Sequence, residues 1–196
     1  MARSIDIPPR WQIATPGQPP TEGKISVVIA PGVSFGDGSH PTTQLCLQAI
    51  AALAPRGQPG WRLLDFGCGN GVLAIGAARL GAVVDAIEID PVAIAEAERN
   101  AQLNAVGDRV RVARTLDGVI GPFELVVANV LLPVLLEYAS GLVGRLALGG
   151  ALVLSGLVGT DVPPISARYA PLLDGLRPEV HELDGWRALV WRKSRR

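Results

Sequence analysis

The sequence predicts one α/β domain built on a doubly wound, mostly parallel sheet. Segments typical of strands and of helices alternate along most of the chain, which is the pattern of a sheet covered by helices. The strand-like segments are apolar on both faces, as buried parallel strands are. With 196 residues, of which 48% are hydrophobic and 18% charged, the chain is long and apolar enough for a full-sized core.

The chain begins with residues 1–24, which we interpret as a proline-rich leader to a domain of residues 25–196. Its prolines lack a backbone donor and favour extended conformations over helix; they are Pro8, Pro9, Pro16, Pro19 and Pro20. From Ile25 a short β-branched run predicts a strand, followed by glycine-rich turns. Pro41 suits the first turn of a helix, and the periodic apolar segment behind it extends that helix to Leu53.

The middle of the chain predicts a βαβαβ unit and its continuation. Strands are expected at 62–66, 83–89, 110–113, 123–129 and 150–158, and helices at 71–82, 91–104 and about 133–146. Asp90 stands directly before the second of these helices, and its short carboxylate predicts an N-cap for the helix that begins at Pro91.

The last segment predicts an antiparallel hairpin. Residues 177–183 and 186–192 flank the dipeptide Asp184-Gly185, which can take the left-handed conformations of a two-residue turn. We expect this pair of strands to close one edge of the sheet.

Composition excludes several classes of protein. Eighteen basic and 18 acidic side chains give a formal net charge of zero, so no general electrostatic attraction for nucleic acid exists. The basic residues at the C-terminus are interpreted as a solubilising end, and direct nucleic-acid binding is not expected; they are Arg192, Lys193, Arg195 and Arg196. The chain lacks the apolar run of a signal peptide or a membrane span, which predicts a cytoplasmic protein without a membrane partner.

The two cysteines predict neither a disulfide nor a metal site. Cys46 and Cys68 form no CxxC pair and belong to no cluster with metal-ligand spacing. We interpret both as reduced thiols and expect no bound metal.

The sharpest local signal is a glycine loop between a strand and a helix, Asp65-Phe66-Gly67-Cys68-Gly69-Asn70-Gly71. A dinucleotide fingerprint requires glycine or alanine at the sixth position from Gly67, where this chain has Val72. No GK[ST] sequence follows the glycines, which excludes a triphosphate P-loop. A nicotinamide oxidoreductase is therefore disfavoured, although it stays an alternative.

These residues meet the chemical needs of S-adenosylmethionine. Glycines at 67, 69 and 71 allow the backbone to approach a small group closely, and Asp65 can bind an ammonium. Glu88, at the end of the next strand, can accept hydrogen bonds from ribose hydroxyls. The alternative for Asp65 is to bond loop amides, and the alternative for Glu88 is to be solvated at a strand end.

With these residues in place, the chain resembles the class I S-adenosylmethionine-dependent methyltransferases, and within them the ribosomal protein L11 methyltransferases. The resemblance lies in FGDGSHPTTQLCLQAI (35–50), LLDFGCGNGVLAIGAARLGA (63–82) and IEIDPVAIAEAERNAQLN (87–104), and it continues in VVANVLLPVLLEYA (126–139) and GWRALVWR (185–192). It implies a seven-stranded Rossmann-like sheet with six parallel strands and one reversed. It also implies cofactor contacts at Thr43, Gly67, Glu88 and Asn129.

Asn129 is the candidate for chemistry. It ends an apolar strand, where packing does not explain an amide. Methyl transfer needs a neutral nucleophile that is aligned and stripped of water, and Asn129 can accept a hydrogen bond from an amine. In the structural alternative, this amide satisfies nearby backbone groups. Thr43 has a structural alternative as a first-turn hydroxyl on helix amides, and His40 is interpreted as a loop-ordering residue.

The acceptor of the methyl group stays open. In the family an additional N-terminal domain recognises the ribosomal protein, and here about 25 proline-rich residues stand in its place. The leading prediction is methylation of a protein amine, a lysine or an N-terminus, as the resemblance to the ribosomal protein methyltransferases implies. The alternatives are a small-molecule N-methyltransferase and a non-catalytic S-adenosylmethionine-binding partner subunit. Asp37, where threonine is usual, is interpreted as a solvated turn residue.

Overall fold

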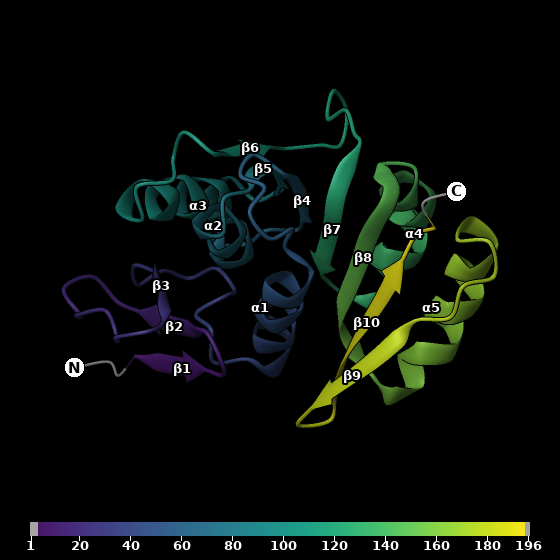
Figure 1. The fold of residues 1–196 in the computed structure, drawn as a ribbon, viewed down its shortest axis with the longest axis horizontal. Coiled ribbons are helices and arrows are strands. Elements are labelled where there is room, and N and C mark those ends of the chain that lie inside the picture. The colour runs from purple at the N-terminus through teal and green to yellow at the C-terminus, as the bar shows by residue number, and fades with distance from the viewer. Residues whose placement is uncertain (1–3, 195–196) are drawn as a thin grey trace.

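A seven-stranded sheet forms the centre of the computed structural model, which describes residues 4–194 (Figure 1). The strand order is β6-β5-β4-β7-β8-β10-β9. The strands are β4 (Arg62–Phe66), β5 (Val83–Ile87), β6 (Val110–Ala113), β7 (Phe123–Asn129), β8 (Leu146–Val158), β9 (Glu179–Leu183) and β10 (Trp186–Arg192). All neighbours are parallel except at β10, which is antiparallel to both β8 and β9. The predicted sheet is confirmed.

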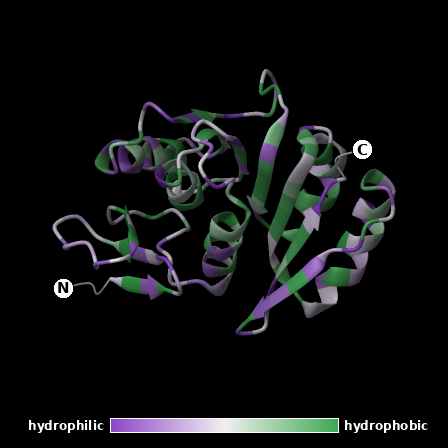
Figure 2. Ribbon diagram, in the orientation of Figure 1, coloured by the Kyte–Doolittle hydropathy of each residue, from purple (hydrophilic) through white to green (hydrophobic). Residues whose placement is uncertain are grey.

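Helices cover both faces of this sheet because alternate residues of a strand point to opposite sides. Leu63 of β4 belongs to a core with α1, α2 and α3, whereas the adjacent Leu64 packs with α4 and α5. The helices are α1 (Pro41–Leu53), α2 (Val72–Arg79), α3 (Pro91–Leu103), α4 (Leu132–Val143) and α5 (Val162–Tyr169). Figure 2 shows a largely hydrophobic β8 and a largely hydrophilic edge strand β9. None of the helices within residues 4–194 has the length and apolarity to span a membrane.

The proline-rich leader contributes strands that pack against the domain. β1 (Ile5–Ile7) and β2 (Trp11–Ala14) form a small separate sheet with β3 (Ile25–Val28), in which β2 and β3 are parallel. Trp11 is fully buried, and its indole N–H donates to the Leu47 carbonyl of α1 at 2.9 Å. The extended conformation was predicted, but this packing was not. The boundary between residues 24 and 25 stays a prediction.

The boundaries of α4 and β8 differ from those expected. The sequence predicts a helix to about residue 146 and a strand from 150, but α4 ends at Val143 and β8 begins at Leu146. The pairing register of β7 and β8 shifts between Phe123 and Leu125. β8 is irregular at this shift, and its Gly149 takes a left-handed conformation (φ 75°). The glycines therefore lie within a strand whose pairing with β7 begins before them, at Leu146. The helix α5 was not predicted.

The predicted C-terminal hairpin is confirmed. Asp184 (φ 49°) and Gly185 (φ 83°) both take left-handed conformations between β9 and β10. In the basic terminal group, Arg192 lies 3.9 Å from Glu179, while Arg195 and Arg196 lie outside the described residues.

Asp90 caps α3 as predicted, because its carboxylate accepts the Val92 N–H at 2.9 Å. We expect Asp90→Ala to lower the free energy of unfolding by about 1 kcal/mol, since the substitution leaves a helix N–H without its partner. Urea unfolding measures this change. Asp90→Ser keeps an acceptor and should lose much less; an equal loss in the two variants would contradict the capping role.

Candidate active site

A cavity of about 850 Å³ opens at the carboxyl ends of β4, β5 and β7. Open α/β sheets bind ligands at this edge. The predicted site residues that line the cavity are Thr43, Gly67, Gly69, Glu88 and Asn129. Asp65 and Gly71 are not among its lining residues. Five of the seven site residues predicted from the sequence therefore line one cavity. The other two, Asp65 and Gly71, are next in the chain to the lining residues Phe66 and Val72.

The glycine loop is shaped by close packing. Gly69 has a φ of 54°, and a Cβ there would lie 2.7 Å from the Phe35 carbonyl oxygen. Gly71 precedes α2 with a φ of 86°, and a Cβ there would lie 3.1 Å from the Cβ of Ala97 in α3. Gly71 thus permits α2 and α3 to approach each other behind the cavity.

Glu88 holds the glycine loop. Its carboxylate accepts the Gly69 N–H at 2.9 Å, the Ile89 N–H at 2.8 Å and the Asp90 N–H at 3.0 Å. A carboxylate offers about four acceptor positions, so roughly one remains for a hydroxyl in the cavity. Glu88 therefore bonds backbone amides and keeps some acceptor capacity. The alternative interpretation, in which Glu88 is only solvated at the end of a strand, is wrong.

Asp65 is the least satisfied polar group of the site. It is fully buried, and neither carboxylate oxygen has a hydrogen-bond partner of standard geometry. Burial raises the pKa of Asp65 to about 7; the Ala74 amide lowers this pKa and the charge of Glu88 raises it further. Because an unpaired buried carboxylate is costly, the residue fits a site that the cationic group of a ligand completes.

Thr43 is the second residue of the site with a buried polar atom that lacks a hydrogen-bond partner. Its hydroxyl oxygen is buried and makes no hydrogen bond with the described residues. The first turn of α1 is instead capped by His40, whose Nδ1 accepts the Thr42 N–H at 3.3 Å and lies 2.7 Å from the Thr42 hydroxyl. The structural alternative for Thr43, a hydroxyl on helix amides, is therefore wrong.

Aromatic side chains pack around His40 in the lining of the cavity. Its ring lies 4.6 Å from the Trp186 ring and 5.2 Å from the Phe35 ring, both measured between centroids. The loop-ordering role expected of His40 agrees with this packing. Trp186 was missed as a site residue because it comes from the distant C-terminal hairpin, although its segment GWRALVWR belongs to the resemblance.

Asn129 ends β7 at the cavity, half-buried. Its side chain makes no hydrogen bond with the described residues, so the amide does not serve nearby backbone groups. The opposite residue in the register, Ser155, is bonded elsewhere: its hydroxyl donates to the Arg187 carbonyl at 2.9 Å. The amide of Asn129 is thereby available to a ligand.

Other candidate groups have structural roles. Cys46 and Cys68 are free and buried, and burial raises the pKa of the Cys46 thiol to about 12 and that of Cys68 well above its usual value. Neither is therefore a thiolate nucleophile at neutral pH. Asp37 accepts the Ser39 N–H at 2.9 Å, as a turn aspartate does. Within residues 4–194, no cluster of His, Cys, Asp or Glu could hold a metal ion.

Comparison with known proteins reveals close relatives. The family model described as ribosomal protein L11 methyltransferase (PrmA) matches residues 1–194. The ribosomal protein L11 methyltransferase of Bordetella parapertussis is 42% identical over 186 residues, which cover 92% of this chain. That of Trichlorobacter lovleyi is 36% identical over 198 residues, covering 95% of this chain. The chain spans 58% and 61% of the lengths of these two relatives.

Solved structures support the same fold. The crystal structure of a ribosomal protein L11 methylase from Lactobacillus delbrueckii subsp. bulgaricus matches with a TM-score of 0.82 and 29% identity. The match covers 98% of each chain. The architecture of this chain is thus similar to that of a solved ribosomal protein L11 methylase.

Proposed function

Since this chain belongs to the ribosomal protein L11 methyltransferase (PrmA) family, we propose that it transfers the methyl group of S-adenosylmethionine to an amine of a ribosomal protein. The observation that carries the proposal is a pair of buried groups without a hydrogen-bond partner, the Thr43 hydroxyl, which lines the cavity, and the Asp65 carboxylate, which directly precedes the lining residue Phe66. Buried polar groups normally have partners, and a polar, cationic ligand would supply them. A ribosomal acceptor would set the reaction in the cytoplasm.

The order of strands suggests how the cofactor lies. Asp65, in β4, and Gly67, which follows this strand, would hold the amino-acid end, while Glu88 follows β5 and has acceptor capacity for a ribose hydroxyl. β6 is the next strand outward, and residues 114–117 behind it line the same cavity. The adenine would therefore lie against residues 114–117, and Gly71 would act through the packing of α2.

The cofactor supplies an electrophilic methyl group on sulfur, and the chain has to position the acceptor amine. The Asn129 side-chain oxygen would accept a hydrogen bond from an N–H of that amine. This bond would direct the nitrogen lone pair of the amine toward the methyl group. Phe35, Trp186 and Tyr138 line the cavity with aromatic surface, which excludes water from the nucleophile. These residues act by alignment and desolvation, for which no strong base is needed.

The acceptor can be tested in lysate of the source cell. Incubation with methyl-labelled S-adenosylmethionine, followed by separation of macromolecules from the low-mass filtrate, should place the label on one small protein band that mass spectrometry identifies as a ribosomal protein. Label in the filtrate would overturn the protein acceptor and indicate a small-molecule amine. The Asn129→Ala chain, in the same lysate, controls for other methyltransferases.

A further inference from the structure

The connection between β6 and β7 lacks a helix, whereas α2 and α3 fill the two preceding connections of the sheet. Residues 114–117 of this connection line the cavity, and residues 118–122 return across the sheet to β7. Its backbone bonds include Val119 N–H to Leu116 oxygen at 3.1 Å and Phe123 N–H to Arg145 oxygen at 2.9 Å. Because no helix packs it in place, side chains must fix this segment.

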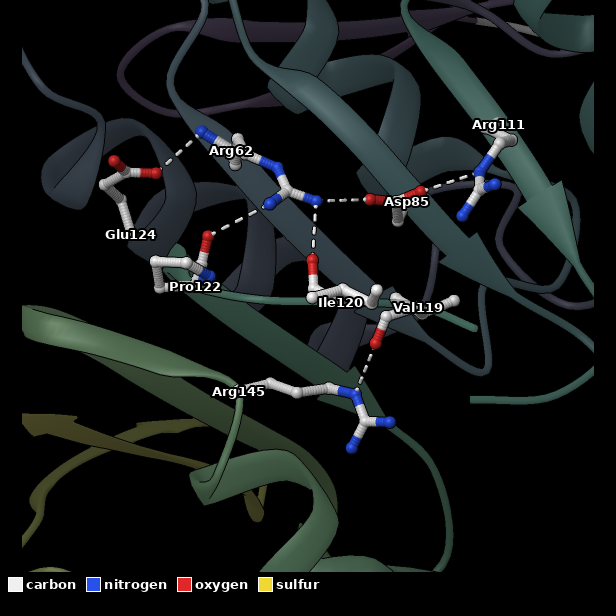
Figure 3. Close-up of polar contacts among 8 residues, drawn as sticks. All are labelled: Arg62, Asp85, Arg111, Val119, Ile120, Pro122, Glu124 and Arg145. Carbon is white, nitrogen blue, oxygen red and sulfur yellow. Dashed lines mark hydrogen bonds and ion pairs between the residues drawn. The ribbon is translucent and has the colours of Figure 1, made fainter. Parts of the chain in front are cut away.

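Arg145 is the side chain that fixes the part of the connection next to the cavity. Its guanidinium donates to the Val119 carbonyl at 2.9 Å (Figure 3). It also donates to the Leu116 carbonyl and to the Gly141 carbonyl of α4, each at 2.9 Å. A Cβ on Gly121 would lie 2.8 Å from the Arg145 carbonyl oxygen, so the two segments also pack directly. One half-buried arginine thus joins the connection to α4.

Both segments that Arg145 joins are walls of the cavity. The connection contributes residues 114–117, and α4 contributes Val134, Glu137 and Tyr138. Charge-assisted hydrogen bonds from a planar guanidinium fix the relative position of the groups they join better than neutral contacts do. Arg145 therefore connects two walls of the cavity without lining the cavity itself.

A second arginine fixes the far end of the connection. Arg62 of β4 donates to the Ile120 carbonyl at 3.0 Å and pairs with Asp85 at 2.9 Å (Figure 3). Asp85 also pairs with Arg111 at 2.9 Å. Arg111 is largely exposed and forms this ion pair without holding the connection, so it provides a matched control.

We propose that Arg145 is a positioning residue for cofactor binding, which holds the Leu116–Val119 turn and α4 at the separation that receives the adenine of S-adenosylmethionine. The inference rests on the proposed function, from which the position of the adenine follows. Arg145 would touch neither the cofactor nor the acceptor and would act through the backbone carbonyls that it binds.

Calorimetric titration of the full chain with S-adenosylhomocysteine tests this inference. We expect Arg145→Met to raise the Kd about tenfold, because the three hydrogen bonds that join the connection to α4 are lost, and Arg145→Lys to raise it less. Arg111→Met should stay within about twofold of the unmodified chain. The number of sites per chain should stay unchanged in every variant. Amide exchange should become faster at residues 116–119 of Arg145→Met and stay unchanged in β4 and β7.

The outcomes separate positioning from general stability. A purely structural role would reduce the number of sites per chain while the remaining sites kept their Kd, and this result would overturn the inference, as would an unchanged Kd and site number in Arg145→Met. If that variant does not fold, the Kd of Arg145→Lys decides in the same way. Absence of S-adenosylhomocysteine binding by the unmodified chain would overturn the proposed function and the inference together.

Discussion

Replacing Asn129 by alanine is expected to lower the turnover number by about 100-fold or more, while S-adenosylhomocysteine binds nearly as tightly as before. The side-chain amide lies at the cavity with no partner among the described residues, so its loss leaves no buried group unpaired. Under the proposed function, the variant loses the acceptor that would align the attacking amine. Because alignment contributes to the transition state more than to cofactor binding, turnover and affinity should separate.

Steady-state rates at saturating cofactor, together with calorimetric Kd values, measure this separation. The melting temperature of the variant is its control, since Asn129 is only half-buried and the fold should be unaffected. A turnover number equal to that of the unmodified chain would remove Asn129 from the catalytic residues. A loss of affinity as large as the loss of turnover would make it a cofactor ligand alone.

Asp65→Asn is expected to stabilise the fold at alkaline pH and to weaken cofactor binding. The pKa of Asp65 is raised from 3.8 to about 7 in the folded chain, mainly by burial. A carboxyl group whose folded pKa is raised favours folding fully below its unfolded pKa, and this contribution is lost as pH rises through the folded pKa. At about pH 8 ionisation therefore costs the fold up to about 4 kcal/mol, which asparagine does not incur.

Urea unfolding across this range measures the effect. The stability of Asp65→Asn relative to the unmodified chain should rise steadily between about pH 4 and about pH 8. In the same variant, the Kd for S-adenosylhomocysteine should rise by about tenfold or more, because the ammonium loses its charged partner. A pH-independent difference in stability would contradict the raised pKa. Unchanged affinity would contradict the role of Asp65 toward the ammonium.

Local patterns were sufficient to predict most of the sheet. The strands around Leu63 and Val126 are apolar on both faces because helices cover both sides, and this property is readable from the sequence. The turn at Asp184-Gly185 was predictable because few residues adopt left-handed conformations readily. Asp90 was predictable as a cap because capping depends on neighbours within one helical turn.

Long-range packing determined what could not be predicted. Trp11 is fixed by the carbonyl of Leu47, a partner that no pattern within the leader reveals. The start of β8 depends on its pairing with β7, which overrides the turn preference of Gly149. At the site, Glu88 was predicted by residue type and position, and Thr43 was implied by the resemblance to the family. Their partners could not be predicted, and these decide that Glu88 is bonded to the loop while Thr43 stays unpaired.

The central claim is that the chain carries out methyl transfer to a ribosomal protein, and intact-mass measurement of a reconstituted reaction tests it most directly. The purified chain is incubated with S-adenosylmethionine and purified ribosomal protein L11. We expect the mass of the ribosomal protein to increase in steps of one methyl group, and the increase to be nearly abolished by Asn129→Ala. An unchanged mass, with S-adenosylhomocysteine still bound at one site per chain, would contradict the claim and indicate a cofactor-binding partner subunit.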